Sequence, residues 1–581
     1  MKMNRIYRNA MAVLALAVGA MTTACSDWDD HYGVSNTGVV GNANGYLWEN
    51  IKSNEQLSMF ANLLEKVGYD SILSTSQSFT VWAPTNDVLA ADYDRLNNLS
   101  ESELLREFVK NHIARNLYAA TGNIGTQKVM MLNKKVVTFS GSGSYTMGDA
   151  NLVDANIPNY NGIMHTVDKE ITFNYNIYET IDSTKYPLDS LHGYFDKYNV
   201  RQFLPGSSVE GSVVDGQITY VDSVFLENNL LFYDYNALIN REDSSYTMIA
   251  PTDRAWRSTY ERISKYFNYV SGYQFIDRSD TPVDTAVTFD AGYLKDSLIK
   301  QSIMSSLFFN NNIRTNRNLL TLEPGQNFPA TDSLQSTLGH KYYASDATEL
   351  FSEGIKMERS NGNFWLVDSL HLFPWRTYAP IIKIEAESGY TVIPEQYRSS
   401  AFSVYETTKN PNVPGRVSNY RYLSVYSESQ SNPSFHMYLP NVLSTTYVIF
   451  GVFVPANITD TAFQGEILPN RARMRIYYNR ANGTKAPTPR NGSYFTTNPE
   501  KVDTVNMGEF EFPIAYRGTS SGQSMYYPSL TIEGNARNNK NYHEDYVLRM
   551  DCVILVPKEM IEYLQQHPEY LKYYPEYKNF L

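Results

Sequence analysis

Apolar and polar residues alternate along two short segments that lie far apart in the chain. The first reads FTVWAPTND from Phe79, and the second reads YTMIAPTDRAW from Tyr246. Apolar residues at every second position before the proline predict a half-buried β-strand. The Ala-Pro-Thr that follows predicts a tight corner, because proline fixes φ and threonine can cap a following helix. The corner residues are Pro84, Thr85, Pro251 and Thr252.

The segments that flank these two strands also occur twice and in the same order. LWENI at 47–51 and IYETI at 177–181 each predict the start of a helix. NGIMHTVDKEI and NGNFWLVDSLHLF each predict a tight turn followed by an alternating strand. Three paired features in one order predict a duplicated unit with a structural role for its corners and turns. The turn residues are Asn161, Gly162, Asn361 and Gly362.

The second copy is longer than the first. The segments GSSVEGSVVDGQITYVDS and NYVSGYQFIDRSDTPVDTAVTFD have no counterpart in the first copy and predict added hairpins or loops. Between the two paired strands, ELLREFVKNHIARNLY in the first copy and YLKDSLIKQSIMSSLFF in the second predict a central helix.

Taken together, these segments resemble a fasciclin domain, with FTVWAPTND as its first strand, ELLREFVKNHIARNLY as its central helix and NGIMHTVDKEI as its closing strand. The resemblance covers about residues 45–376 and implies two α+β domains. In that family a Tyr-His pair on the central helix is tied to adhesion, whereas this sequence reads Asn111-His112. We therefore expect His112 to be a structural histidine at the edge of the core, held by a hydrogen bond.

Short alternating strands separated by Asn, Gly, Ser and Pro fill the last third of the chain, from about Ile381. They include SFHMYLPNV, TTYVIFGVFVPA, ARMRIYYN, EFEFPIAY and DYVLRMDCVILVP, and this spacing predicts an antiparallel β-sandwich. IKIEAESGY and LRMDCVILVP resemble the opening and closing strands of carbohydrate-binding modules of the galactose-binding-like jelly-roll kind. That resemblance implies a structural calcium ion bound by Glu385, Glu387 and Asp551; the alternative is that these are ordinary solvent-facing acids.

Tryptophan is absent from the chain after Trp375. An aromatic platform for sugar would therefore have to come from Tyr or Phe, and the candidates are Tyr526 and Tyr527. The alternative is that one of this pair lies in the core and the other on the surface. The remaining cysteine of the sandwich region, Cys552, lies in an apolar run and is expected to be a buried, inert thiol.

The N-terminus, MKMNRIYRNAMAVLALAVGAMTTAC, combines a basic start with an apolar stretch and predicts a secretory signal peptide. TTAC resembles the lipobox of bacterial lipoproteins, which implies that Cys25 is lipidated and anchors the protein in the outer membrane; the alternative is an ordinary signal peptide with a chance cysteine. SDWDD after Cys25 resembles the surface-export signal of lipoproteins in glycan-harvesting Gram-negative bacteria. GVSNTGVVGNANG is typical of a flexible tether.

A formal net charge of −12 argues against nucleic acid as a partner. The sequence also lacks G-x-S-x-G, H-E-x-x-H, phosphate-loop and EF-hand spellings, which favours a non-enzyme without any cofactor except the implied calcium. Glycosidase carboxylates need not be near one another in sequence, so an unrecognised glycoside hydrolase stays open as a third hypothesis.

The predicted fold class is therefore multidomain, with two α+β fasciclin-like domains followed by an antiparallel β-sandwich of jelly-roll type. The expected function is non-catalytic binding of an extracellular glycan at the cell surface, as an accessory of an outer-membrane nutrient-uptake system. The partners would be a TonB-dependent transporter and its glycan-binding lipoprotein; the alternative is a protein-protein adhesion or scaffold module. The predicted segments are 1–24 signal peptide, 25–44 lipidated tether, 45–176 and 177–378 fasciclin-like domains, 379–558 sandwich, and 559–581 C-terminal helix and Tyr/Pro tail.

Overall fold

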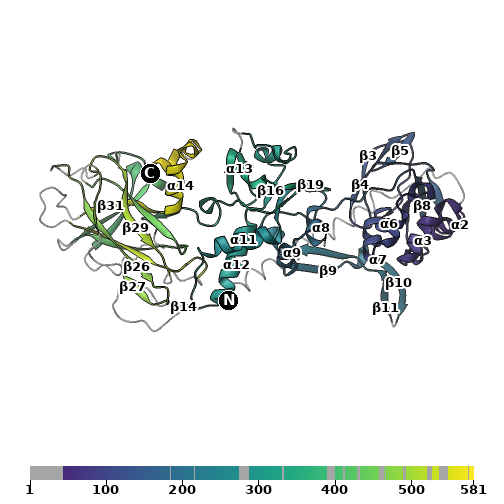
Figure 1. Cartoon of the computed structure of the whole chain (residues 1–581), viewed down its shortest axis with the longest axis horizontal. Helices are drawn as coiled ribbons and strands as arrows, with labels where there is room; N and C mark the ends of the chain where they lie inside the picture. The colour runs from purple at the N-terminus through teal and green to yellow at the C-terminus, as the bar shows by residue number, and fades with distance from the viewer. Residues whose placement is uncertain are drawn as a thin grey trace.

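The computed structural model describes residues 43–581 with several gaps, and these residues form three bodies in a row (Figure 1). We name them the first unit (from Leu47), the second unit (from Ile177) and the sandwich (from Ile382). The predicted signal peptide, most of the tether, Cys25 and Tyr526 lie outside the described residues. The gaps are 184, 215, 274–286, 330–332, 389–399, 410–411, 428–431, 457–458, 460–463, 465, 488–492, 520–526, 536–546 and 574.

The first unit is built on a four-stranded sheet in the order β2-β1-β8-β7. Its two central strands are parallel, and the two outer strands run antiparallel to them. Small helices pack on the sheet because Leu47, Phe60 and Leu64 join the apolar side chains of β1 in one core. The strands are β1 Phe79–Pro84, β2 Ile113–Arg115, β7 Ile157–Asn159 and β8 Gly162–Val167, and the helices are α2 Leu47–Ser53, α3 Ser58–Lys66, α4 Tyr69–Leu73, α5 Asn86–Leu89 and α6 Tyr93–Asn98.

A separate antiparallel meander closes the other side of the first unit. Its inward side chains, among them Val129, Phe139 and Met147, form a second small core with Trp82 of β1. The meander comprises β3 Asn123–Met130, β4 Val136–Ser142, β5 Ser144–Met147 and β6 Ala150–Asn151.

The second unit repeats the sheet of the first in the order β16-β13-β20-β19. Phe79 pairs with Gly162 in the first unit, and Tyr246 pairs with Gly362 at the matching position of the second. The predicted duplication is therefore present residue by residue in the central strand pair. The elements are β13 Tyr246–Pro251, β16 Phe308–Asn310, β19 Ile355–Arg359, β20 Gly362–Val367, α8 Ile177–Asp182, α9 Asp189–Asp196, α10 Leu231–Asp234, α11 Asp253–Ser264, α12 Ala291–Met304 and α13 Ala344–Phe351, with a small β17 Ser333–Gln335 and β18 Lys341–Tyr343 hairpin.

The central helix predicted for the first unit is shorter and less regular than expected. The prediction extended to Tyr118, but the helical segment comprises α7 Glu101–Glu103, a π-helical turn Leu104–Phe108 and a 3-10 turn that ends at Asn111. The chain then enters β2 because Ile113 and Ala114 pair with β1 and are buried. In the second unit, α12 is a regular helix, but it ends at Met304, and the last two residues of the predicted segment, Phe308 and Phe309, lie in β16.

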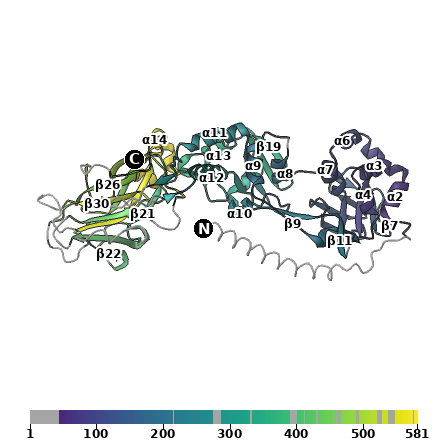
Figure 2. The ribbon, with the colours of Figure 1, turned by 90° about the horizontal axis from the view of Figure 1, so that it is seen from below.

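The first predicted insertion of the second unit forms a long antiparallel ribbon that reaches the first unit (Figures 1 and 2). Asp222 near its end contacts Lys110 of the first unit at 3.0 Å and accepts a 3.2 Å hydrogen bond from the Tyr69 hydroxyl. Lys135 of the first unit is in turn buried between Glu179 and Glu242 of the second. The ribbon strands are β9 Asn199–Phe203, β10 Val209–Val214, β11 Gln217–Asp222 and β12 Phe225–Asn229.

The second insertion leaves its own unit and enters the sandwich. Its described strands, β14 Gly272–Tyr273 and β15 Val287–Thr288, pair with each other. Tyr273 is 1% exposed and belongs to the sandwich core, where its hydroxyl donates to the Ala515 carbonyl at 2.6 Å. This contact joins the second unit to the sandwich beyond the chain connection itself.

The C-terminal region forms the predicted antiparallel β-sandwich. One sheet has the order β22-β23-β31-β25-β29, with β21 also paired to β31, and the other has the order β24-β30-β26-β27, with β28 also paired to β26. The first contains β21 Ile382–Glu385, β22 Ser400–Glu406, β23 Arg421–Ser427, β25 Thr446–Phe453, β29 Asp503–Glu511 and β31 Val547–Pro557. The second contains β24 Ser434–Tyr438, β26 Arg471–Asn479, β27 Lys485–Pro487, β28 Tyr494–Thr496 and β30 Ser529–Gly534.

The C-terminal helix α14 (Lys558–Gln566) and the tail after it cover one outer face of the sandwich. Met560 and Leu564 pack on Phe450 and Val556, and Tyr573 stacks on Tyr343 of the second unit with ring centroids 5.3 Å apart. Cys552 lies under this layer with 1% exposure, as predicted for an inert thiol. Among the described residues, none of the helices combines the length and apolar character needed to cross a bilayer.

Candidate functional site

The repeated Asn-Gly turns hold the frame of each unit together. Asn161 accepts a hydrogen bond from the Leu47 amide at 2.8 Å and donates to the carbonyls of Leu73 and Thr75. Asn361 makes the same three bonds, with the Ile177 amide and the carbonyls of Ile239 and Arg241, at 2.7–3.1 Å. Each asparagine thus fixes the first helix of its unit to the loop before the central strand.

The glycine after each asparagine is required by a close backbone approach. A Cβ at Gly162 would lie 2.0 Å from the Phe79 carbonyl oxygen, and a Cβ at Gly362 would lie 1.8 Å from that of Tyr246. The prolines at the corners, Pro84 and Pro251, end β1 and β13 and are buried. These contacts support the structural interpretation of both motifs.

The threonines at the two corners differ. Thr252 caps α11, since its hydroxyl accepts from the Ala255 amide at 3.3 Å and also donates to Asp368 at 2.7 Å. Thr85 was predicted to cap in the same way, but its side chain makes no cap hydrogen bond. The neighbouring Asn86 side chain turns instead toward the Met59 amide, at 2.9 Å, and links α5 to α3. The cap prediction is therefore correct for Thr252 and wrong for Thr85.

His112 is a structural histidine, as expected, but it lies inside the core rather than at its edge. It is 0% exposed, its Nδ1 lies 2.8 Å from the Phe108 carbonyl and its Nε2 accepts from the Ile171 amide at 2.9 Å. Since Nε2 is an acceptor, Nδ1 carries the proton and the ring is neutral. Burial lowers the pKa of His112 to about 4. Both ring nitrogens are occupied, which leaves the side chain no capacity to bind a partner.

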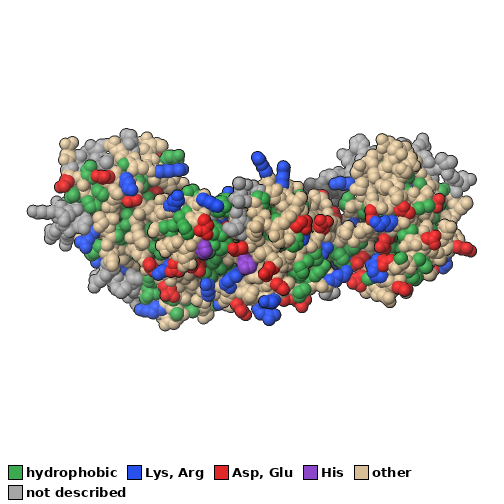
Figure 3. Space-filling model, turned by 45° about the horizontal axis from the view of Figure 1, so that its top comes forward, with side chains coloured by type: hydrophobic (Ala, Val, Ile, Leu, Met, Phe, Trp, Pro, Cys, Tyr) green, Lys and Arg blue, Asp and Glu red, His purple; other side chains and the backbone are tan. Residues whose placement is uncertain are grey.

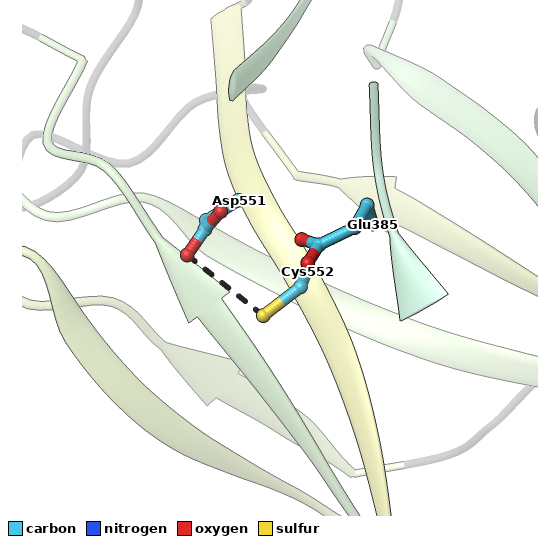
Figure 4. A group of neighbouring side chains, drawn as sticks. All are labelled: Glu385, Asp551 and Cys552. Atoms are coloured by element: carbon cyan, nitrogen blue, oxygen red, sulfur yellow. Dashed lines mark hydrogen bonds between the residues drawn. The ribbon is translucent and has the colours of Figure 1, made fainter. Parts of the chain in front are cut away.

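Two of the three acids predicted to bind calcium, Glu385 and Asp551, lie together with Cys552, with one ligand atom of each within 4.8 Å of the others, and Glu387 is not part of this group. The Ser418 hydroxyl lies 2.7 Å from Glu385 Oε2 and also makes a short contact with Asp551 Oδ1. The Ser418 amide donates to both carboxylate oxygens of Asp551 at 3.2 Å. Figure 4 shows Glu385 and Asp551 on neighbouring strands, β21 and β31. We call Glu385, Glu387 and Asp551 the acid cluster.

Two backbone features bring the acid cluster together. The pairing of β31 with β25 skips Asp551, because Val452 opposes Cys552 whereas Phe453 opposes Met550, and a bulge of this kind redirects a side chain. Glu385 and Glu387 stand two residues apart, a spacing that predicts both side chains on one face of a strand, but Glu387 does not lie on that strand. β21 ends at Glu385, and Glu387 lies in the turn that follows.

The loop that contacts the acid cluster has an unusual backbone. Asn419 and Tyr420 adopt φ values of +50° and +58°, which is common for asparagine but costly for tyrosine. The Asn419 side chain hydrogen-bonds the Glu387 carboxylate. Strained backbone of this kind is typical of a loop whose position is fixed by a site.

Burial and mutual repulsion disfavour the charged forms of Glu387 and Asp551. Lys383, whose Nζ lies 3.0 Å from Glu385 Oε1, offsets part of this repulsion. Burial, together with the nearby negative charges of Glu385 and Asp551, raises the pKa of Glu387. Burial and the charge of Glu385 likewise raise the pKa of Asp551, against the hydrogen bonds from Ser418. Oε2 of Glu387 is buried without a hydrogen-bond partner among the described residues. One Ser418 hydroxyl proton also cannot serve two carboxylates at once.

These observations fit a hard cation held by oxygen ligands. The carboxylates of Glu385 and Asp551, with an unused buried oxygen on Glu387, are of the kind that Ca²⁺ prefers as ligands. Cys552 lies beside the cluster, with its Sγ 3.8 Å from Asp551 Oδ2 (Figure 4), but burial raises the pKa of its thiol well above the ordinary value. A neutral thiol is a poor ligand for Ca²⁺, so the residues present favour calcium over a softer metal.

A second candidate site lies on the outer face of the sheet β24-β30-β26-β28. Residues that pair across neighbouring strands share a face, so the register Ser434–Glu533–Arg473–Tyr494 places these side chains in one row. The same rule places His436, Thr531 and Arg475 in the next row, and the core residues Ile476 and Leu530 on the opposite side. We call this set, which lies on the side away from the sandwich core, the Arg–Tyr face: Ser434, His436, Tyr438, Arg471, Arg473, Arg475, Tyr477, Lys485, Tyr494, Thr496, Ser529, Thr531 and Glu533. Its His436, Tyr438, Ser529 and Thr531 are buried, and its three arginines are half-buried.

The Arg–Tyr face combines aromatic rings with hydrogen-bonding groups. The Arg471 guanidinium lies over the Tyr494 ring at 4.2 Å, and the Arg475 guanidinium lies over the Tyr477 ring at 4.9 Å. Tyr494 is 39% exposed. Such a mixture of flat apolar surface and polar groups is typical of sites that bind sugars.

The structure describes only one residue of the predicted sugar platform, so that platform stays a prediction. Tyr526 lies outside the described residues, and Tyr527 is half-buried against the sandwich core. The residues of β26 were missed, although ARMRIYYN shows arginine at every second position before the tyrosines. That alternation is a signal for a strand with arginines along one face.

Comparisons with known proteins agree with this architecture. The model of the Fasciclin domain matches residues 55–172, so the first unit contains a Fasciclin domain. No curated protein matches the sequence. The chain thus consists of two α+β fasciclin-like domains followed by an antiparallel β-sandwich, as its sequence predicted.

Several solved structures are similar to parts of the chain. A FAS1 domain pair from the insect cell adhesion molecule Fasciclin I matches at 14% identity and a TM-score of 0.20, over 55% of this chain and 97% of that chain. The CBM22-2 xylan-binding domain from Paenibacillus barcinonensis matches at 10% identity and a TM-score of 0.20, over 30% of this chain and 98% of its own. The CBM35 from Paenibacillus barcinonensis matches at 12% identity and a TM-score of 0.15, over 30% and 98%.

Proposed function

We propose that this protein is a non-catalytic glycan-binding lipoprotein of the cell surface, and that the Arg–Tyr face is its sugar site. The observation that supports the site is the row of Arg471, Arg473 and Arg475 beside Tyr477 and Tyr494 on one face of a sheet. Aromatic rings bind the apolar face of a sugar, and guanidinium groups donate hydrogen bonds to its oxygens. The two fasciclin-like units act as spacer and docking surface.

The proposed location follows from the N-terminal sequence. A signal peptide and a lipidated Cys25 would anchor the chain in the outer membrane, and the acidic SDWDD would direct it to the outer surface. Such a protein would serve an uptake system as accessory to a TonB-dependent transporter and its glycan-binding lipoprotein. In cells, Cys25→Ala should abolish membrane retention, because acylation requires that thiol. Retention of the variant at the wild-type level would refute the anchor.

Glycan binding is tested with the soluble chain, residues 26–581, on a polysaccharide panel. Tyr494→Ala should weaken binding about tenfold, which corresponds to about 1.4 kcal/mol. Tyr293 is also well exposed but lies on α12 of the second unit, so Tyr293→Ala is the matched control and should bind like the wild type. Absence of binding to every polysaccharide would favour the protein-protein adhesion alternative, and release of reducing sugar would favour the hydrolase.

In the acid cluster, Glu385, Glu387 and Asp551 would hold Ca²⁺, which would neutralise their carboxylates and fix the end of β21 to β31. An ion that binds only the folded state stabilises by about 2.7 kcal/mol at a hundredfold excess over its Kd. A chelator should therefore lower the melting temperature of the sandwich by several degrees. Magnesium should restore it poorly, because it requires a smaller octahedral shell.

The matched variants for calcium are Glu387→Gln and Glu406→Gln. The first removes a charge from the acid cluster and should reduce the effect of the chelator. The second changes a carboxylate on the same sheet that pairs with Lys409 at 2.9 Å and should leave the effect unchanged. An identical melting curve with and without calcium would return the acid cluster to ordinary acids, without affecting the proposal for the Arg–Tyr face.

A further inference from the structure

Two exposed tyrosines lie on the other sheet of the sandwich, where β22 ends and β23 begins. Tyr405 is 42% exposed and Tyr420 is 66% exposed. Tyr405 pairs with Tyr422 of β23, on the face opposite to Leu423, which belongs to the sandwich core. The Tyr420 carbonyl accepts a 3.3 Å hydrogen bond from the hydroxyl of Thr407, two residues beyond Tyr405. Both tyrosines therefore lie at one corner of this sheet, and we call them the edge tyrosines.

The ring of Tyr405 is held in place by its neighbours. It stacks on the buried Tyr422 ring, with centroids 5.6 Å apart and 13° between the ring planes. The Arg549 guanidinium lies 5.6 Å from the Tyr405 ring centroid and is itself fixed by a 3.0 Å hydrogen bond to the Ala456 carbonyl. A ring that is already fixed loses little conformational entropy when a ligand covers its exposed surface.

The backbone of Tyr420 is strained although its side chain is mostly exposed. A φ of +58° is costly for an aromatic residue, and an exposed ring gains little from packing that could offset this cost. The two residues before it, Ser418 and Asn419, contact the acid cluster and hold the loop in this form. Strain that is maintained in a fixed loop is evidence for a functional role of the residue that carries it.

The charged side chains beside the edge tyrosines are paired with one another. Glu406 Oε2 lies 2.9 Å from Lys409 Nζ, and Glu406 Oε1 lies 3.5 Å from Arg421 Nη2. Basic and acidic side chains are likewise interspersed on the face of the molecule shown in Figure 3. None of these three charges is left alone to select a charged ligand. The two rings instead offer apolar surface, on which the C–H face of a sugar can stack.

We propose that Tyr405 and Tyr420 form a second glycan-binding site, on the sheet opposite to the Arg–Tyr face. Its ligand is a neutral polysaccharide of β-linked pyranose units, because such a chain is flat and presents the apolar faces of its rings to an aromatic platform. This inference rests on the proposed glycan-binding function and adds a site and a ligand class to it.

Two oligosaccharides of glucose provide the test. Cellohexaose is β-linked and flat, whereas maltohexaose contains the same units in α-linkage and is curved. In calorimetry, the soluble chain, residues 26–581, should bind cellohexaose about fivefold more tightly than maltohexaose. Raising the salt concentration should leave this binding unchanged, because a neutral sugar forms no ion pair that salt could screen.

Substitutions then locate the effect. Tyr405→Ala and Tyr420→Asn should each weaken the binding of cellohexaose about fivefold. Asparagine adopts a left-handed backbone more readily than tyrosine, so Tyr420→Asn should not lower the melting temperature of the sandwich. A residue that served only stability would not lose binding while the fold stayed as stable. The matched control is Tyr160→Ala, because Tyr160 is as exposed as Tyr420 but lies in the first unit. It should bind like the wild type.

The outcomes separate this inference from the proposed function. If Tyr494→Ala weakened the binding of cellohexaose but both edge variants left it unchanged, the second site would be overturned and the Arg–Tyr face would stand. Binding of maltohexaose as tight as that of cellohexaose would overturn the ligand class. If cellohexaose did not bind but another polysaccharide of the panel did, only this inference would fail. Binding to no sugar would overturn both proposals.

Discussion

At the centre of the first unit, Trp82 on β1 lies opposite His165 on β8, whereas the second unit has Ile249 and Trp365 at the same two positions. Each unit thus places one tryptophan in its central strand pair, but on opposite strands. In the first unit the His165 ring stacks on Trp82 with centroids 5.7 Å apart, while in the second Trp365 packs edge-on against Phe351. The same pair of strands thus accommodates the tryptophan on either strand, because in both units the side chains at these two positions are packed in the core.

A second exchange accompanies the first. The amide of Trp82 donates to the carbonyl of His112, and the amide of Ile249 donates at the same distance, 2.9 Å, to that of Leu307. His112 and Leu307 are therefore equivalent. The first unit has buried two histidines where the second has a leucine and a tryptophan. The stability of the two units should therefore depend differently on pH. A buried histidine disfavours the protonated ring, whereas leucine and tryptophan do not titrate.

The largest expected difference between the units is therefore their stability in acid. Burial lowers the pKa of both His112 and His165 to about 4. Unfolding returns them to about 6.5, so the folded state loses stability as the pH falls from 6.5 toward 4. The loss is about 3 kcal/mol for each histidine, or about 6 kcal/mol for the first unit. Hydrogen exchange on the full chain, corrected for intrinsic rates, should show the first unit opening at pH 4.5 before the second.

The residue difference between the two units suggests a variant that tests whether the buried histidines cause the acid sensitivity. His112→Leu places the second unit's residue in the first and should reduce the acid-induced loss from about 6 to about 3 kcal/mol. The second unit retains His340, whose pKa burial also lowers, so some acid sensitivity is expected there. If both units lost protection together and His112→Leu had no effect on the pH profile, the histidines would not be the cause.

The next largest effect is the loss of stability when the asparagine of each Asn-Gly turn is replaced. This loss should be equal in the two units if the two asparagines have the same role. Asn161→Ala and Asn361→Ala each remove three hydrogen bonds from buried backbone groups. Each should lower the free energy of unfolding of its own unit by about 3 kcal/mol. Denaturant unfolding followed by hydrogen exchange measures both in the full chain. Asn62→Ala, on the exposed side of α3, is the control. A difference of more than about 1.5 kcal/mol between the two variants would contradict a shared role.

The smallest effect should again distinguish the units. Thr252→Ala removes a helix cap and a hydrogen bond to Asp368, and should cost about 1.5 kcal/mol. Thr85→Ala removes no cap and should cost less than about 0.5 kcal/mol. Thermal unfolding of both variants under identical conditions measures the difference. Equal costs would show that the capping contact at Thr252 contributes nothing to stability.

The sequence predicted features that depend on neighbouring residues. The Ala-Pro-Thr corners, the Asn-Gly turns and the strands were predicted because each reflects local backbone geometry. The half-burial predicted for β1 and β13 was wrong, because helices and neighbouring strands bury both faces of these central strands. Order and spacing then predicted the duplication and the sandwich. The three hydrogen bonds of Asn161 could not be predicted, because its partners, Leu47 and the loop at Leu73, lie about 90 to 115 residues away.

Features that depend on distant contacts were missed for the same reason. Helical periodicity continued through Ile113, but pairing with β1 placed that residue in a strand. The acid cluster was named correctly from a resemblance, yet neither the bulge at Asp551 nor the Ser418 bridge follows from the sequence of either strand. The Arg–Tyr face needed the register of four strands before arginines and tyrosines from separate segments could be seen together.

The insertion of Tyr273 into the sandwich core determines how the molecule would transmit a mechanical pull. A chain anchored at its N-terminus and holding a polymer through its C-terminal sandwich is stretched along its length. The peptide near residue 379 is then joined by further connections between the second unit and the sandwich, of which the Tyr273 contact is the most deeply buried in the sandwich core. Tension would be divided between the chain connection and these contacts. The part carried by Tyr273 would pull its buried ring sideways against the sandwich core. The joint would yield only after that ring had left the core, which makes the last two bodies respond to force as one piece.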